Sequence, residues 1–146
     1  MSGMNGAVAW VLRSPLHFVL SPGLMLITIT GRRSGRRYTI PVGYQRQGET
    51  LHVLVSKPAR KQWWRNFREP GDVEVRVRGE QRRGRARVVP GESAEFRERV
   101  AETLRRLPFL ARQFGIERAR GGALSEAQWR ALSAQAVLVS IALERR

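Results

Sequence analysis

The stretch from Leu24 to Ser56, LMLITITGRRSGRRYTIPVGYQRQGETLHVLVS, contains three extended runs separated by two glycine-containing turns. β-Branched residues dominate the runs, as is typical of strands, and the second turn, Gln47-Gly48-Glu49, has the composition of a tight hairpin. Pro41 cannot donate a backbone hydrogen bond, so its strand is expected at a sheet edge or at a bulge. The sequence therefore predicts three successive strands, over residues 24–30, 38–45 and 50–56.

Three further segments have strand patterns. Valines at 73, 75 and 77 alternate with charged residues, which indicates a half-buried strand, and residues 82–89 follow as the second half of a hairpin. The segment AVLVSIAL at 136–143 is almost continuously apolar and is interpreted as a buried strand that returns to the sheet. Six strands without a strand–helix–strand rhythm predict an α+β, mainly β, fold: an antiparallel, barrel-like sheet with short flanking helices.

Helical patterns flank these strands. Residues 62–68 have the composition of a short helix, and Ser93 is interpreted as the N-cap of a longer one. Ser125 and Gln128 form a capping box for a further short helix. We therefore expect a helical insertion over about residues 92–133, before the final strand.

The apolar segment near the N-terminus bears on localisation. Between Ala7 and Ile29 it is interrupted by Arg13 and by two prolines, so it lacks the roughly 20 uninterrupted apolar residues that a membrane-spanning helix needs. We expect an N-terminal helix over about residues 6–20 that either packs on the domain or touches a membrane surface peripherally. The sequence thus predicts a cytoplasmic protein, with peripheral membrane contact as the alternative.

Charge and composition narrow the function. A chain of 146 residues fits one domain, and with no cysteine and two histidines it predicts neither thiolate chemistry nor a metal site. The formal net charge is +15, and residues 1–90 hold 17 basic but only 5 acidic side chains. Because arginine binds phosphate and carboxylate groups in bidentate fashion, we expect an anionic partner: nucleic acid, a membrane surface or a small molecule.

The chain lacks a recognisable catalytic set of its own. Neither a Ser-His-acid trio nor a pair of carboxylates has a suitable spacing, so an enzyme of this sequence is expected to rely on a bound cofactor. Three segments are candidates for holding an anionic one. Gly31-Arg32-Arg33-Ser34-Gly35 offers backbone amides and arginines, Ser56-Lys57 offers a hydroxyl and an ammonium group, and Trp63-Trp64-Arg65-Asn66 offers either an aromatic wall or core packing.

The order of these segments carries a resemblance. TGRRSGRRYTIPV, a strand ending in SK, then WWRNF and a valine-alternating strand resemble the deazaflavin-dependent nitroreductase family of small split β-barrel proteins, which bind coenzyme F420. The resemblance covers about residues 24–90 and the final strand. It implies one split-barrel domain over residues 1–146, and hydride transfer from reduced F420 to an electron-poor small molecule such as a quinone, enone or nitro compound.

The resemblance also implies site residues. Ser56 is the one catalytic candidate, as a hydrogen-bond donor. The sequence departs from the family at Tyr38, where an arginine is frequent, and it has no tyrosine after Tyr44. The implied cofactor-binding residues are Arg32, Arg33, Ser34, Gly35, Pro41, Ser56, Lys57, Trp63, Trp64 and Asn66.

Several alternatives stay open. FMN, which split-barrel relatives also bind, is the alternative cofactor, and a non-catalytic cofactor carrier is an alternative to the enzyme. The hairpin carries six arginines, which form either a solvated outer face or a nucleic-acid surface, and the absence of interleaved aromatic residues favours the first. These arginines are Arg76, Arg78, Arg82, Arg83, Arg85 and Arg87. The sequence does not decide between a monomer and a homodimer.

Overall fold

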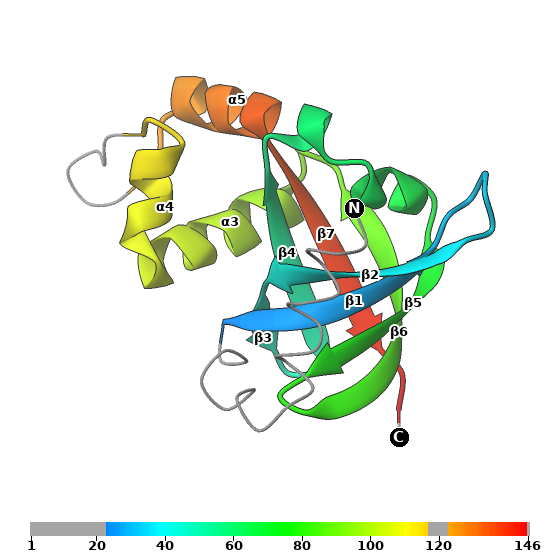
Figure 1. Cartoon of the computed structure of the whole chain (residues 1–146). Helices are drawn as coiled ribbons and strands as arrows, with labels where there is room; N and C mark the ends of the chain where they lie inside the picture. The colour runs from blue at the N-terminus through cyan, green and yellow to red at the C-terminus, as the bar shows by residue number, and fades with distance from the viewer. Residues whose placement is uncertain (1–22, 117–122, 146) are drawn as a thin grey trace.

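The computed structural model describes residues 23–116 and 123–145. In this part of the chain, seven strands form one sheet in the order β2-β1-β5-β6-β7-β4-β3, and all neighbouring pairs are antiparallel. The sheet curls into a barrel (Figure 1), which confirms the predicted split β-barrel. The strands are β1 (Leu24–Thr30), β2 (Arg37–Gly43), β3 (Gln45–Gln47), β4 (Thr50–Ser56), β5 (Gly71–Val77), β6 (Glu80–Val89) and β7 (Ala136–Leu143).

A single residue joins the two edges of the sheet. β2 and β3 lie at opposite ends of the strand order, yet only Tyr44 separates them in the chain, so the sheet curls until its edges meet. The one strand expected over residues 38–45 is therefore two strands, because Tyr44 turns its side chain into the barrel core. Pro41 lies in the edge strand β2, where its missing amide hydrogen costs no ladder bond.

Alternate residues of the strands fill the barrel interior. The three valines of β5 all point inward and are buried, as their spacing predicted. β7 is buried on both faces, because Val139 and Ile141 belong to the interior while Ala136 and Leu138 belong to a second core under the helices. This central position between β6 and β4 explains why the sequence of β7 has no polar alternation.

In the described part of the chain, three α-helices lie together on one side of the barrel (Figure 1). The side chain of Ser93 accepts a hydrogen bond from the Phe96 amide, and Ser125 forms the predicted capping box with Gln128. The second helix lies within the helical insertion expected over about residues 92–133, and Pro108 stands in its first turn, where its missing amide hydrogen is harmless. The helices are α3 (Ala94–Arg106), α4 (Pro108–Gln113) and α5 (Glu126–Gln135).

Two 3-10 helices cover one end of the barrel. The first, η1 (Pro58–Arg60), lies in the basic segment between β4 and the second. The second, η2 (Trp63–Phe67), takes the place of the short helix expected over residues 62–68 and contacts β6 and β7. Its three aromatic side chains are buried in the barrel core, so η2 plugs the barrel.

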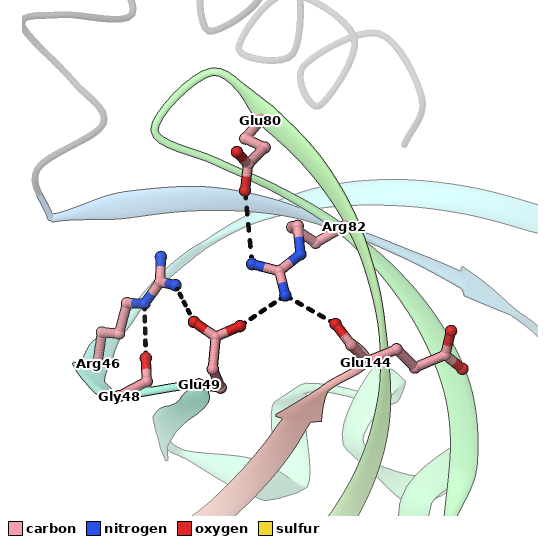
Figure 2. A network of polar contacts seen from close by, with 6 residues as sticks. All are labelled: Arg46, Gly48, Glu49, Glu80, Arg82 and Glu144. Carbon is pink, nitrogen blue, oxygen red and sulfur yellow. Dashed lines mark hydrogen bonds and ion pairs between the residues drawn. The ribbon is translucent and has the colours of Figure 1, made fainter. Parts of the chain in front are cut away.

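A charged network closes the end of the barrel at which β4 begins (Figure 2). The guanidinium group of Arg82 donates to the carboxylates of Glu49 (2.6 Å) and Glu80 (3.4 Å) and to the backbone carbonyl of Glu144 (2.7 Å). Arg46 binds the same carboxylate of Glu49 at 2.9 Å. Hydrogen bonds from Arg82 and then Arg46 hold the pKa of Glu49 below its usual value.

Arg82 is the exception to the solvated arginine face expected on the β5–β6 hairpin, where Arg83 and Arg85 are exposed. The side chain of Arg82 is only 5% exposed, so it is a structural group. Arg85 pairs with Asp72 across the hairpin at 3.3 Å, and Arg87 pairs with Glu95 of α3 at 2.6 Å. Part of the positive charge of the hairpin is therefore matched within the protein.

The helix expected over residues 6–20 lies outside the described residues. Within residues 23–116 and 123–145, none of the helices has both the length and the apolar character needed to cross a membrane.

Candidate active site

A cleft of about 1460 Å³ lies beside the seam at which β2 approaches β4. β2 forms one wall, and the outward face of β4 forms the floor with His52, Leu54 and Ser56. The opposite wall comes from the junction of α3 and α4, at Leu107 and Phe109. The cleft is thus bounded by segments distant in the chain, brought together where the barrel closes.

One end of the cleft is basic. Four basic side chains line it and, among the described lining residues, none is acidic. Arg37 pairs with Glu74 at 2.7 Å, whereas Arg36 and Arg60 have no ion pair with any described residue. This end therefore has positive charge that the rest of the described protein does not neutralise. The four residues are Arg36, Arg37, Arg60 and Lys61.

Lys61 stands beside Ser56 at the end of β4. Its ammonium group donates to the backbone carbonyl of Ser56 at 2.6 Å and to the Ser56 hydroxyl at 3.3 Å. Burial, followed by the positive charge of Lys57, lowers the pKa of Lys61. Lys57 itself is exposed, does not line the cleft and adopts a left-handed backbone conformation with φ 49°. The ammonium group expected next to Ser56 is thus supplied by Lys61.

Asn66 of η2 fastens the basic β1–β2 turn to the end of the barrel. Its carbonyl oxygen accepts a hydrogen bond from the Arg32 amide at 3.0 Å, and its amide group donates to the Trp63 carbonyl (3.0 Å) and the Tyr38 hydroxyl (3.3 Å). The Arg32 side chain pairs with Glu69 at 2.9 Å. Figure 1 shows this turn projecting beyond the barrel next to the 3-10 segment. Asn66 therefore positions the turn rather than lining the cleft.

The two tryptophans have different surroundings. Trp63 lines the cleft and packs edge-on against Phe67, with the ring centroids 6.3 Å apart. Trp64 is turned away from the cleft and donates from its indole nitrogen to the Pro58 carbonyl at 2.9 Å. The guanidinium groups of Arg65 and Arg68 lie over the Trp64 ring. The interpretation of the motif as core packing therefore applies to Trp64. Trp63 fits both interpretations, because it packs in the core and also forms part of the wall of the cleft.

The structure brings together only part of the predicted cofactor site. Ser34, Pro41, Ser56 and Trp63 line the cleft. The other predicted residues do not line it: Arg32, Arg33, Gly35, Lys57, Trp64 and Asn66. Sequence reasoning missed Arg36, Arg60, Lys61 and His52. Arg60 and Lys61 belong to a basic segment at residues 57–61, which could have indicated them. No local pattern in the sequence indicates His52.

Comparison with known proteins identifies the family. The model of the F420H(2)-dependent quinone reductase family matches residues 15–119, which is more than half of the chain. The match defines an F420-dependent oxidoreductase, which confirms the predicted enzyme class and cofactor. The chain belongs to the F420H(2)-dependent quinone reductase family. No curated protein sequence matches it.

Solved structures share the fold at low sequence identity. A putative pyridoxamine 5'-phosphate oxidase from Listeria innocua is 15% identical, with a TM-score of 0.52 over 92% of this chain and 94% of that chain. A FAD-binding protein from Mesorhizobium loti is 16% identical, with a TM-score of 0.53 over 90% and 91% of the two chains. A heme storage protein from Vibrio cholerae is 16% identical, with a TM-score of 0.52 over 97% and 92%. These likenesses establish the fold.

Proposed function

We propose that the cleft binds reduced F420 with the anionic groups of the cofactor at the basic end, and that a quinone is the acceptor. The observation that carries this proposal is the charge of the lining, with four basic and no acidic side chains among the described residues. F420 bears a phosphate and a glutamate tail, for which guanidinium and ammonium groups are suitable partners. When bound, reduced F420 supplies the hydride and the protein supplies position and charge.

Arg36 and Arg60 are the primary anion contacts in this proposal. Neither has a carboxylate partner among the described residues, so neither must break an ion pair to bind a ligand. In this proposal Arg33, Ser34, Gly35 and Lys57 adjoin this end, whereas the Arg32 side chain already pairs with Glu69 and the Arg32 amide with Asn66. Gly35 has φ 69°, a left-handed conformation that glycine adopts without strain. The β1–β2 turn therefore adopts its conformation at the entrance of the cleft without backbone strain at Gly35.

Ser56 is proposed as the hydrogen-bond donor to the reacting groups. Its oxygen accepts from Lys61, which leaves the hydroxyl proton available for an acceptor in the cleft. The positive charge of Lys61 also favours any negative charge that develops beside Ser56. The Lys61 ammonium group and the Ser56 hydroxyl are held next to each other on the floor of the cleft, because Lys61 also donates a hydrogen bond to the Ser56 carbonyl.

The apolar part of the lining suits a planar ring. Trp63 and Pro41 present rigid surfaces on the side of the cleft near Ser56, and Ile40 and Leu54 continue the apolar surface. Such surfaces exclude water and hold a ring in one orientation, which are the contributions a protein makes to hydride transfer. Trp64 and Asn66 act behind this surface, by fixing η1 and the β1–β2 turn.

The proposal is tested by titrating the protein with F420 and, separately, with FMN, following ligand fluorescence at several salt concentrations. Micromolar or tighter F420 binding that weakens with salt is expected, because the contacts are ionic and partly solvent-exposed. Tight FMN binding without F420 binding would contradict the cofactor assignment. Salt-sensitive binding of random oligonucleotides, with neither cofactor bound, would favour the nucleic-acid alternative.

A further inference from the structure

His52 lies at the end of the cleft opposite the basic groups. It belongs to β4, whose Leu51 and Val53 point into the barrel core, so His52 shares the outward face with Leu54 and Ser56. It stands four positions before Ser56 in the same strand, which places the two residues about 13 Å apart. The cleft is therefore long enough to hold different polar groups at its two ends.

His52 as a whole residue is 6% exposed and makes no hydrogen bond with any other described residue. Its ring nitrogens are not among the fully buried polar atoms of the described residues, so they keep slight contact with solvent. Its charged neighbours are engaged elsewhere: Arg87 pairs with Glu95, and Arg99 contacts Gln47. Burial lowers the pKa of His52, the charges of Arg99 and Arg87 lower it further, and Glu95 opposes them. The ring is thus neutral at neutral pH, with one donor and one acceptor nitrogen.

Thr103 and the α3–α4 junction complete this end of the cleft. Thr103 lines the cleft, and its hydroxyl donates to the Arg99 carbonyl at 2.9 Å, so the hydroxyl proton is already used. Leu107, Leu110 and the half-exposed Phe109 form an apolar wall above Leu54. This end thus combines an apolar slot with one unpaired, nearly buried hydrogen-bonding group.

A hydrogen-bonding group that keeps only slight contact with solvent and has no partner among the described residues is free to bind a polar group of a ligand in the cleft. We propose that His52 anchors the acceptor, by donating a ring N–H hydrogen bond to a carbonyl oxygen of a flat, apolar quinone that lies against Leu54 and the α3–α4 wall. This inference rests on the proposed function, because it assigns the acceptor end of the same cleft. His52 binds and orients the acceptor, and the reaction takes its hydride from the cofactor end.

The direct test uses the imidazole proton NMR signals, of which the chain has only two sets, from His17 and His52. A His17→Gln variant assigns them. The protein is titrated with menadione and, in parallel, with methylnaphthalene, which has the same ring system but no carbonyl groups. We expect menadione to shift the His52 signals saturably and methylnaphthalene to shift them much less. Unshifted His52 signals, or equal shifts with both compounds, would overturn the proposal.

A kinetic test separates this anchor from a merely structural role. His52→Leu removes the hydrogen bond and is expected to raise the KM for menadione about tenfold, while His52→Gln keeps an N–H donor and recovers most of the loss. The Kd for F420 should be unchanged in both variants. An unchanged KM in a folded His52→Leu protein counts against the anchor. Should the wild-type protein fail to bind F420, the proposed function falls, whereas the menadione titration still decides the role of His52.

Discussion

The basic side chains near the two ends of β4 differ in whether carboxylate groups neutralise them. Where β4 begins, Arg82 and Arg46 share the carboxylate of Glu49, and Arg82 is enclosed by two further oxygen acceptors (Figure 2). Where β4 ends, Arg36 and Arg60 face a cleft whose described lining contains no carboxylate. The first group of charges is internally neutralised, and the second is left for a partner.

The difference shows that net charge alone is a poor guide to function. A formal charge of +15 is compatible with nucleic acid, membrane or cofactor binding. Sorting the basic residues by whether a carboxylate already satisfies them separates structural arginines from those available to a ligand. Arg82, Arg85 and Arg87 each have a carboxylate partner already, although only Arg82 is nearly buried, so the hairpin offers an anion fewer unpaired arginines than its sequence suggests.

The largest expected effect is on folding, at the neutralised end. Arg82→Met removes three hydrogen bonds from one nearly buried guanidinium group and leaves the Glu144 carbonyl and Glu49 carboxylate without it. The unfolding midpoint, measured by circular dichroism, should fall by several degrees. The Kd for F420 should stay the same, because the network lies at the other end of β4.

Arg85→Met is the matched control, since Arg85 lies on the same strand but is exposed and pairs with an exposed Asp72. It should leave the unfolding midpoint almost unchanged. Equal destabilisation by the two substitutions would mean that burial of Arg82 has no structural weight.

A second prediction compares two lysines. Lys61→Met should weaken F420 binding about tenfold, because the ammonium group beside Ser56 is lost from the cleft. Lys57→Met removes the same charge from outside the cleft and should have a smaller effect. Isothermal titration at fixed ionic strength measures both. A larger loss of F420 affinity in Lys57→Met would show that Lys57, the residue that the sequence resemblance indicated, contacts the anionic groups of the cofactor.

The smallest expected effect has the opposite sign. Glu74 is the carboxylate that engages a cleft arginine, Arg37, at 2.7 Å. Glu74→Gln should release Arg37 and tighten F420 binding about two- to threefold, because a partly exposed ion pair is worth at most about 1 kcal/mol. The same titration checks it, and weaker binding in this variant would show that the pair holds Arg37 in its productive position.

Most of the sheet could be predicted from the sequence because strand patterns are local. The valines of β5 and the apolar run of β7 mark their strands directly, and Ser125 with Gln128 marks a helix start. The break at Tyr44 could not be found in this way, because it depends on the two sheet edges meeting around a common core.

The candidate site was predictable only in part, for a similar reason. Ser56 and Trp63 are recognisable from the order of the motifs, and both line the cleft. Lys61, and not Lys57, contacts Ser56, and the backbone at Lys57 is left-handed. No sequence pattern indicates that conformation. His52 becomes a candidate only when α3 and α4 fold over the outward face of β4.

In the proposed function, the unpaired basic residues of the cleft bind the cofactor, and the total charge of the protein does not decide its affinity. The measurement that tests this claim most directly is the Kd for F420 of an Arg36→Ala/Arg60→Ala protein against an Arg83→Ala/Arg112→Ala protein. Both variants lose two exposed arginines, and the second pair lies outside the cleft. We predict binding at least about tenfold weaker in the first variant than in the second. Equal affinities in the two variants would contradict the account.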